Sequence, residues 1–221
     1  MRRSLFQVTC VLVFLLAPRL GYSDQSRESW TEPVTGIKFL QIPGGNFVMG
    51  SPSTEEGRQQ FAETQHTVSV GSFWLAQTEV TQAQWEAVMG SNPSYFQGER
   101  LAEGVDSAHL PVERVSWDDV VEFTVLSGFS LPSEAQWEYA CRGGSSGPFA
   151  GTGVLADMGW YVGNSGGRPH AVGSRLPNAF GLYDLHGNLY EWCGDVYNED
   201  FYASEGASGP DPVYNGAGDY H

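Results

Sequence analysis

Positive charge is scarce in this sequence. Its 221 residues include 26 Asp and Glu but only 11 Lys and Arg, which gives a formal net charge of −15 at pH 7. Lysine occurs once, as Lys38. Because nucleic-acid binding relies on clusters of Lys and Arg that neutralise phosphates, this balance argues against a nucleic-acid partner. Hydrophobic residues at 41% and aromatic residues at 13% also exclude a disordered acidic tail.

Long hydrophobic runs are missing as well. One apolar stretch of ten residues, 8–17, follows Arg2 and Arg3 and precedes small residues in the −3 and −1 positions for cleavage before Asp24. This pattern is typical of a secretory signal peptide, whereas a membrane anchor needs about 20 apolar residues. We therefore expect residues 1–23 to be removed. The rest is expected to be secreted, to the periplasm, the extracellular space or the secretory pathway, without a membrane span.

Cysteine is rare, with three residues in the whole chain. Loss of the signal peptide would remove Cys10 and three arginines, so that Cys141 and Cys193 remain and 26 acids face 8 bases, a net charge of −18. In an oxidising compartment the two thiols could form a disulfide that closes a loop of about 50 residues and stabilises by roughly 3–4 kcal/mol. Other partners, and a structural role for Cys141 on the apolar face of its helix, are the alternatives. The excess of acid favours solubility and a bound cation.

Three short helices are predicted by a repeated signature. In each, a hydroxyl residue is followed three positions later by Gln or Asp, so that side chains and backbone can cap one another at the first turn. A glycine, which adopts the left-handed conformation without strain, ends each apolar pattern. The capping residue, its partner and the terminal glycine are Thr81, Gln84 and Gly90, then Ser116, Asp119 and Gly128, then Ser133, Gln136 and Gly143.

The segments before these helices predict strands. Residues 24–36 are polar and are expected to form a flexible lead-in. Residues 37–50 predict a β-hairpin that turns at the Pro-Gly-Gly sequence of 43–45. Within residues 66–76, apolar side chains alternate with polar ones at Val68 and Val70, and the chain is then expected to turn at Gly71.

The segment after the third helix has a different composition. Beyond Gly143 no helical pattern recurs, and 17 of the last 79 residues are glycine, interleaved with Trp and Tyr. Such a segment is expected to be irregular backbone packed over aromatic rings and held by side chains or ions. No repeat or linker divides the chain, so we expect a single domain over residues 37–221.

One stretch carries most of the candidate chemistry. PNAFGLYDLHGNLYEWCGD, from Pro177 to Asp195, places the oxygen donors Asp184, Asn188, Glu191 and Asp195 within twelve residues. Hard cations such as calcium bind six to eight oxygens from carboxylates, amides and backbone carbonyls. The spacing differs from that of an EF-hand loop. An ordinary acidic turn, in which the same side chains cap backbone groups, is the alternative.

Patterns for catalysis are weaker. His170 and His186 could act as ligands or bases, and a Cys–His pair could form, although isolated histidines more often have structural roles. The sequence holds no G-x-S-x-G elbow and no phosphate-binding glycine loop. Cys141 and Cys193 lack the paired spacing of a zinc site.

Five blocks follow one another along roughly residues 37–200: FVMGSPSTEEGR, EVTQAQWEAVMG, PVERVSW, LPSEAQWEYACRGG and PNAFGLYDLHGNLYEW. In order and spacing they resemble the sulfatase-modifying factor family, whose best-known member is the formylglycine-generating enzyme. The resemblance implies a single α+β domain with a C-type-lectin-like core. It also implies little regular secondary structure, with short helices and strands, long glycine-rich loops and stabilisation by calcium.

The resemblance also implies which residues bind the metal. The calcium cage of the family falls on the side chains of Asp184 and Glu191 and on the carbonyls of Gly187 and Leu189. A second calcium site of the family would begin at 157–158, but the loop NSGGRPHAVG does not supply its other half.

The catalytic residues of the family have no counterpart in this sequence. Relatives use two cysteines to bind copper, a soft ion suited to thiolates, and oxidise a substrate cysteine to formylglycine with oxygen. Those cysteines follow an RGGSW-like strand, which does not occur before His221, and neither Cys141 nor Cys193 matches the pair. Thr124 and Ser130 also replace a cysteine and an arginine found in some members. We therefore predict a C-terminally truncated member without catalytic or cofactor-binding residues.

Two functions are consistent with these observations. The first is a secreted member of the formylglycine-generating enzyme family, monomeric and inactive as this truncated chain, whose partner is a protein or peptide such as a sulfatase. The alternative is a non-catalytic lectin-like module that binds protein or glycan. A third branch, which uses iron to form sulfoxides, would need an additional helical domain for which this chain has no room.

Overall fold

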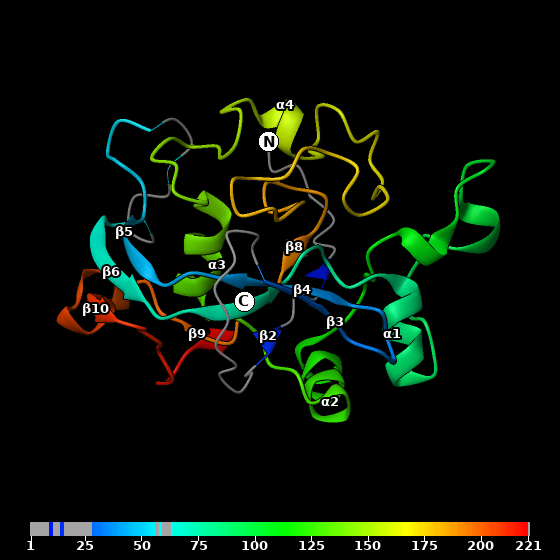
Figure 1. Ribbon diagram of the computed structural model, residues 1–221, viewed down its shortest axis with the longest axis horizontal. Helices are drawn as coiled ribbons and strands as arrows, with labels where there is room; N and C mark the ends of the chain where they lie inside the picture. The colour runs from blue at the N-terminus through cyan, green and yellow to red at the C-terminus, as the bar shows by residue number, and fades with distance from the viewer. Residues whose placement is uncertain (1–8, 11–13, 16–27, 56–57, 59–62, 221) are drawn as a thin grey trace.

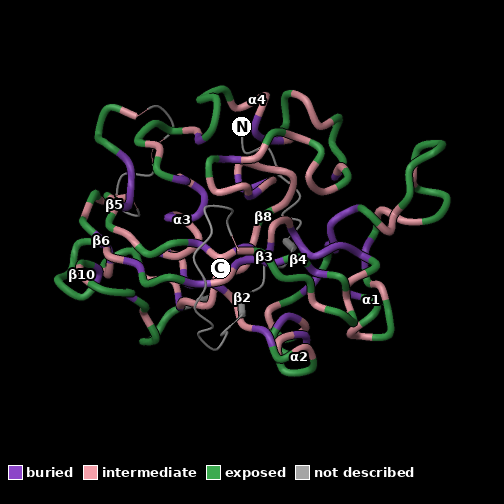
Figure 2. The backbone as a smooth tube through the Cα atoms, viewed as in Figure 1, coloured by how far each residue is buried: buried purple, intermediate pink, exposed green. Residues whose placement is uncertain are grey.

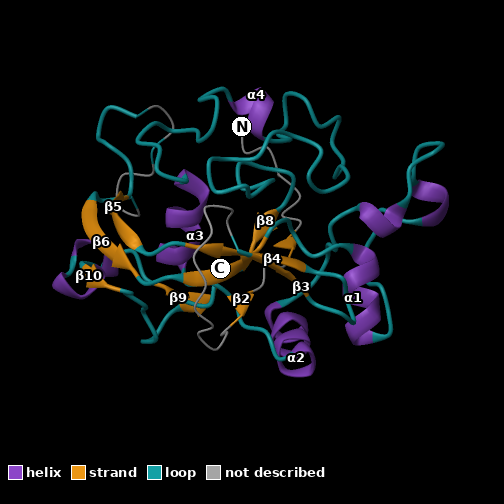
Figure 3. Cartoon of the chain, viewed as in Figure 1, coloured by secondary structure: helices purple, strands orange, loops and turns teal. Residues whose placement is uncertain are grey.

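The computed structural model describes residues 9–10, 14–15, 28–55, 58 and 63–220. Most of the predicted signal peptide, 1–23, therefore lies outside the described residues. Short helices and strands are joined by long loops (Figures 1 and 3). The helices are α1 (Gln82–Met89), η1 (Gly98–Arg100), η2 (Ser107–His109), α2 (Trp117–Ser127), α3 (Glu134–Arg142), α4 (Leu155–Met158), η3 (Phe201–Ala203) and η4 (Glu205–Ala207), where η denotes a 3-10 helix. The strands are β1 (Thr9–Cys10), β2 (Phe14–Leu15), β3 (Ser29–Thr31), β4 (Lys38–Ile42), β5 (Gly45–Met49), β6 (His66–Val70), β7 (Phe73–Ala76), β8 (Tyr190–Glu191), β9 (Val196–Tyr197), β10 (Gly209–Pro210) and β11 (Asp219–Tyr220).

The strands form small sheets. The largest has the order β2-β7-β4-β3 with antiparallel pairs, and Leu40 lies opposite Leu75 in it. A second has the order β10-β6-β5 and pairs Phe47 with Val68. Two further pairs are β11 with β9 and β1 with β8. β1 and β2, which fall within the predicted signal peptide, thus pair with β8 and β7.

The hairpin predicted over residues 37–50 is wrong. β4 pairs with β3 and β7, whereas β5 pairs with β6 in the other sheet. The glycines serve close packing instead of a hairpin turn. A Cβ on Gly44 would lie 2.8 Å from the Val70 carbonyl oxygen, and one on Gly45 would lie 2.5 Å from the Tyr139 hydroxyl. The chain therefore passes from one sheet to the next at this point.

The three predicted helices are confirmed with their caps. α1, α2 and α3 each begin after a complete capping box, at Thr81, Ser116 and Ser133. Each ends at a glycine in the left-handed conformation, with φ of 72°, 74° and 54° in turn. α4 was not expected from the sequence, because four residues show no periodicity and its N-cap makes no side-chain hydrogen bond.

The segment before the first large sheet also differs from the sequence-based expectation. Three residues of the segment 24–36, expected to form a flexible lead-in, form β3 and pair with β4. Glu32 accepts hydrogen bonds from the N–H groups of Val34 and Thr35 and orders the turn that follows. No helix in the described part of the chain is long and apolar enough to cross a bilayer.

Aromatic rings form much of the core between the largest sheet and the helices. Buried residues follow β4, β7 and the inner faces of α1 and α2 (Figure 2). Trp85 of α1 stacks on Phe123 of α2 with ring centroids 4.8 Å apart, and Phe39 of β4 packs against Phe129 at 5.1 Å. The irregular loops of residues 143–189, yellow to orange in Figure 1, lie over the upper side of the sheets and carry the candidate site.

Candidate functional site

The block predicted to bind metal is a tight loop that rests on the backbone of Trp160. Asp184 and Asn188 have left-handed backbones, with φ of 63° and 78°. The Asn188 N–H donates to the Trp160 carbonyl at 2.7 Å. A Cβ on Gly187, where φ is 143°, would collide with that same carbonyl. Glycine is therefore required here by close approach of two backbones.

Two carboxyl groups of this loop are buried and incompletely paired. Oδ2 of Asp184 accepts from the Gly173 N–H at 2.7 Å, and Oε2 of Glu191 accepts from Trp137 Nε1 at 2.5 Å. Among the described residues, Oδ1 of Asp184 and Oε1 of Glu191 are buried without any hydrogen-bond partner. Burial raises the pKa of Asp184 to about 6. Burial, with a further contribution from the charge of Asp184, raises the pKa of Glu191 to about 8.

These residues fit a hard cation. A buried carboxylate oxygen without a donor is costly, and a cation between the two acids would satisfy both oxygens. No group of three or more His, Cys, Asp and Glu that could hold a metal occurs in the described part of the chain. The remaining ligands would therefore be neutral oxygens, which is the type of donor that the carbonyls of Gly187 and Leu189 supply and that calcium accepts.

The other two oxygen donors of the block have structural roles. Asn188 donates from Nδ2 to Glu79 at 2.7 Å and to the His170 carbonyl at 3.1 Å, and its Oδ1 accepts from the His170 N–H at 2.9 Å. Asp195 accepts from the N–H of Glu134, at the first turn of α3, at 2.7 Å. Asn188 and Asp195 are therefore engaged in hydrogen bonds of their own, and the prediction of a metal site rests on Asp184 and Glu191.

Sequence reasoning missed Glu79. Its carboxylate is fully buried and accepts from Asn188 Nδ2 and, at 3.1 Å, from the N–H of Leu189. It therefore anchors the centre of loop 184–191 from about 110 positions earlier in the chain. No local pattern around residue 79 distinguishes it from an exposed glutamate.

Both described cysteine side chains are free thiols, so the disulfide considered from the sequence is not formed. Sγ of Cys141 donates to the Leu185 carbonyl at 3.3 Å and lies 3.8 Å from both ring nitrogens of His186. The His186 Nε2 in turn accepts from the Ala150 N–H at 2.9 Å. Burial raises the pKa of Cys141 and Cys193 well above the ordinary value and lowers that of His186. The Cys–His contact is consequently structural, because neither a thiolate nor an imidazolium is favoured.

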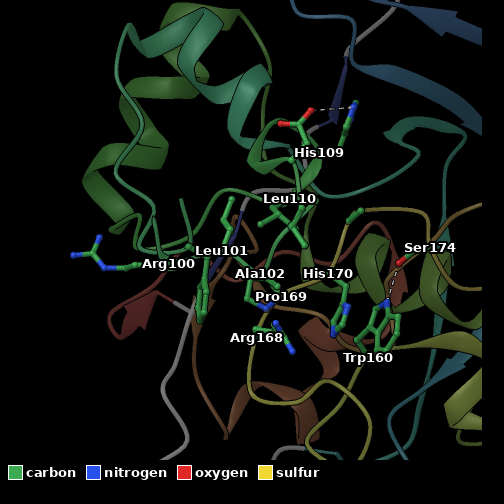
Figure 4. Close-up of a pocket in the computed structure, with 15 residues that line it drawn as sticks. Arg100, Leu101, Ala102, His109, Leu110, Trp160, Arg168, Pro169, His170 and Ser174 are labelled. Atoms are coloured by element: carbon green, nitrogen blue, oxygen red, sulfur yellow. Dashed lines mark hydrogen bonds and ion pairs between the residues drawn. The ribbon is translucent and has the colours of Figure 1, made fainter. Parts of the chain in front are cut away.

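A cavity of about 610 Å³ opens between two loops (Figure 4). One loop, 96–110, connects α1 to α2, and the other, 160–174, follows α4. The lining is largely apolar, and its residues are Phe96, Arg100, Leu101, Ala102, Gly104, Val105, Asp106, His109, Leu110, Trp160, Arg168, Pro169, His170, Ala171 and Ser174.

Trp160 and His170, which line this cavity, form a stack of three side chains together with Arg175. Trp160 and His170 are nearly parallel, at 10°, with ring centroids 3.6 Å apart. The Arg175 guanidinium lies 3.6 Å from the centroid of the Trp160 ring. Two groups at this distance cannot share one face of the ring, so Trp160 is sandwiched between them. Trp160 Nε1 also donates to Ser174 at 2.9 Å (Figure 4), which fixes the orientation of the indole.

Comparison with known proteins gives a consistent result. Residues 25–217 match the family model described as "Sulfatase-modifying factor enzyme 1-like domain". The chain is 29% identical to "Chaperone protein LppX" of Paenibacillus barcinonensis, with 85% of this chain and 81% of the relative covered. It is 29% identical to the "Formylglycine-generating enzyme" of Streptomyces coelicolor, with coverage of 80% and 75%.

Solved structures share the fold. "Treponema denticola variable protein 1" superposes with a TM-score of 0.73 at 27% identity and covers 88% of this chain and 85% of its own. PvdO from Pseudomonas aeruginosa superposes with a TM-score of 0.71 at 24% identity, with coverage of 89% and 82%. The predicted fold class, a C-type-lectin-like domain of short helices, short strands and long loops, is confirmed.

Proposed function

The chain belongs to the sulfatase-modifying factor family, and we propose that it acts there as a polypeptide-binding domain that does not itself oxidise cysteine. One observation carries the proposal. The 610 Å³ cavity, which is large enough for several side chains, has no cysteine among its lining residues. A thiol that oxidises a bound substrate must lie beside it.

The chemistry of the thiols supports the absence of oxidation. Copper in the formylglycine-generating enzymes is held by cysteine, and the thiolate is the form that binds a soft metal. Burial holds Cys141 and Cys193 in the protonated form. The described residues therefore do not fit copper, and no redox step is assigned to them.

The aromatic wall favours polypeptide over glycan as the ligand. Protein sites that bind sugars commonly place a pyranose ring against an open aromatic face. Both faces of Trp160 are covered, by His170 and Arg175. The apolar side chains of Phe96, Leu101 and other lining residues suit the side chains of a peptide.

Calcium has a supporting role in this proposal. Asp184 and Glu191 would hold it with their unpaired oxygens, assisted by the carbonyls of Gly187 and Leu189. The same loop contacts the cavity wall, because Asn188 donates to the Trp160 and His170 carbonyls. A cation in the loop would neutralise two buried acids and keep the wall in place. We also propose secretion through the signal peptide of residues 1–23, with a polypeptide partner and no nucleic acid.

A peptide-binding assay tests the proposal. A combinatorial peptide library is passed over the immobilised full chain, and retained peptides are titrated against Ala171→Trp, which fills the cavity with a large side chain. Ala203→Trp is the matched control, because Ala203 is exposed and outside the cavity. Binding to the parent and to Ala203→Trp, but not to Ala171→Trp, is expected. Retention of no peptide would reject the proposal.

Oxidation is the second candidate, because relatives named formylglycine-generating enzyme match at 27–33% identity. A cysteine-containing sulfatase peptide is incubated with the chain, copper, a thiol reductant and oxygen, and its mass is followed. No formylglycine is expected. Turnover that survives removal of contaminating metal enzymes would favour this candidate over a pure binding role.

A further inference from the structure

We infer that Arg168 makes the cavity selective for a peptide segment that presents a carboxylate next to an apolar or aromatic side chain. The inference rests on the proposed function and deepens it by naming the chemistry of the ligand. Arg168 lines the cavity together with apolar residues such as Leu101, Val105 and Leu110.

Arg168 is unusual among the arginines of this acidic chain. Its guanidinium makes no hydrogen bond, ion pair or ring contact with any residue that the structure describes. The others whose side chains are described are engaged: Arg58 with the carbonyls of Ser51 and Glu63, Arg142 with Glu138, Arg100 and Arg114 over the Tyr95 ring, and Arg175 over Trp160. In a chain with 26 acids and 11 bases, an arginine without a carboxylate is available for one from a ligand.

The backbone that carries Arg168 is held firmly on one side. Pro169 is buried, and the His170 N–H donates to Asn188 Oδ1 at 2.9 Å. The His170 ring is fixed by its stack on Trp160 and by a hydrogen bond from Nε2 to the Ser165 carbonyl at 2.9 Å. Figure 4 shows Arg168 beside Pro169 and His170, across from Leu101 and Ala102. The backbone beneath the exposed Arg168 side chain is therefore already ordered before a ligand binds, and only the side chain has to be fixed.

The local charge around the cavity suits an anion despite the negative charge of the whole chain. Asp106 is the only carboxylate among the lining residues. It is already engaged, because Oδ1 accepts from the Ala108 N–H at 2.9 Å and Oδ2 lies 3.8 Å from His109 Nε2. At physiological salt, charges more than about 8 Å away are largely screened. The lining therefore carries two arginines, Arg100 and Arg168, against one carboxylate that is already engaged.

Matched ligands separate the carboxylate from the apolar part. N-acetyl-Leu-Phe with a free C-terminal carboxylate, its C-terminal amide, and N-acetyl-Leu-Asp-Phe-amide are titrated into the full chain, with calorimetry and tryptophan fluorescence as readouts. We expect the free acid to bind roughly tenfold or more tightly than the amide, as one charge-assisted hydrogen bond provides. The aspartyl peptide tells whether a side-chain carboxylate serves as well as a terminal one.

Variants test whether Arg168 is responsible. In Arg168→Gln the acid and the amide should bind equally, whereas Arg168→Lys should keep part of the preference. Lys38→Gln removes one charge from an exposed position in β4, outside the cavity, and should leave the preference unchanged. Thermal unfolding of each variant confirms that it folds.

The outcomes are distinguishable. Equal binding of acid and amide to the parent would overturn the role of Arg168 and leave peptide binding intact. Failure of both ligands and of the peptide library would overturn the proposed function together with this inference. A preference for the acid that persists in Arg168→Gln would also overturn the assignment, because another group would then hold the carboxylate.

Discussion

Residues 28–142 and residues 143–220 fold against each other, but different forces hold them. The first region contains α1, α2, α3 and most of the two larger sheets, and its rings pack in an apolar core. The second region contains one four-residue α-helix and relies on buried polar groups. Asn178, for example, donates to the carbonyls of Ala140 and Cys141 at the end of α3 and accepts from the N–H groups of Phe180 and Leu182.

This difference has a consequence for how each region responds to its surroundings. Apolar packing is insensitive to pH and to ions, whereas buried carboxyl groups such as Asp184 and Glu191 depend on their partners and on charge. The first region should therefore depend mainly on packing, although it also contains the buried carboxylate of Glu79 and the raised pKa of Glu134. The second should fail through loss of a hydrogen bond, a cation or a proton.

The largest effect is expected in the apolar core of the first region. Trp85→Ala removes a ring that is 2% exposed and stacked on Phe123, so it should lower the free energy of unfolding by about 3–5 kcal/mol. Urea unfolding measures the change. Val125→Ala on α2 is the control, since Val125 is 74% exposed, and a comparable loss in that variant would contradict the packing argument.

Calcium should act on the second region. At a calcium concentration one hundred times the dissociation constant, the gain in unfolding free energy is about 2.7 kcal/mol. Differential scanning calorimetry with and without calcium measures it as a rise in Tm. Glu191→Ala should abolish the rise, while Glu122→Ala, an exposed acid on α2, should retain it. Absence of any shift at millimolar calcium would count against the site.

Asn188 links loop 184–191 to the cavity wall. Asn188→Ala leaves the buried carboxylate of Glu79 without one of its donors and places Ala in a left-handed conformation, so we expect a loss of about 2 kcal/mol. Asn188→Gly keeps the backbone conformation and isolates the hydrogen-bond contribution. Hydrogen exchange should show lost protection in 160–189 before α1 and α2 are affected. Equal loss of protection in both regions would contradict the expectation that the second region opens first.

The smallest effect concerns pH. Burial raises the pKa of Glu134 to about 7 from an ordinary 4.5, so the folded state binds this proton more tightly than the unfolded state. The stabilisation is complete below about pH 4.5 and is lost as pH rises through 7. Glu134→Gln should remove this dependence. Between pH 5 and pH 8 the parent should lose about 1 kcal/mol of unfolding free energy that the variant keeps. The effect is limited to this size because Glu134 is partly accessible to solvent. A difference that does not change with pH would contradict the assignment.

Local signals in the sequence were reliable where the physics is local. Thr81, Ser116 and Ser133 cap helices through bonds that span three residues, and the glycines that end those helices act within one turn. The pairing of strands is different. Gly44 and Gly45 suggested a hairpin, but Val70 and Tyr139, far along the chain, determine how closely the backbone passes there.

In the candidate site, too, the sequence identified some of the residues, but only the structure shows where their side chains point. Family resemblance identified Asp184 and Glu191, and the structure leaves one oxygen of each unpaired. Composition also suggested Asn188 and Asp195, whose side chains point to Glu79 and α3 instead. The direction of a donor on an irregular loop depends on its φ and on distant partners, which short-range patterns do not contain.

The sequence by itself determined the excess of acid, the short capped helices, the glycine-rich irregular region and the family. These features depend on composition and on contacts within a few residues. Only the tertiary structure decided that the two thiols are free, that Glu79 anchors loop 184–191, and that loops 96–110 and 160–174 line a cavity with Arg168 at its edge. The reason is that each of these features joins residues far apart in the chain, so it exists only once the core has brought them together.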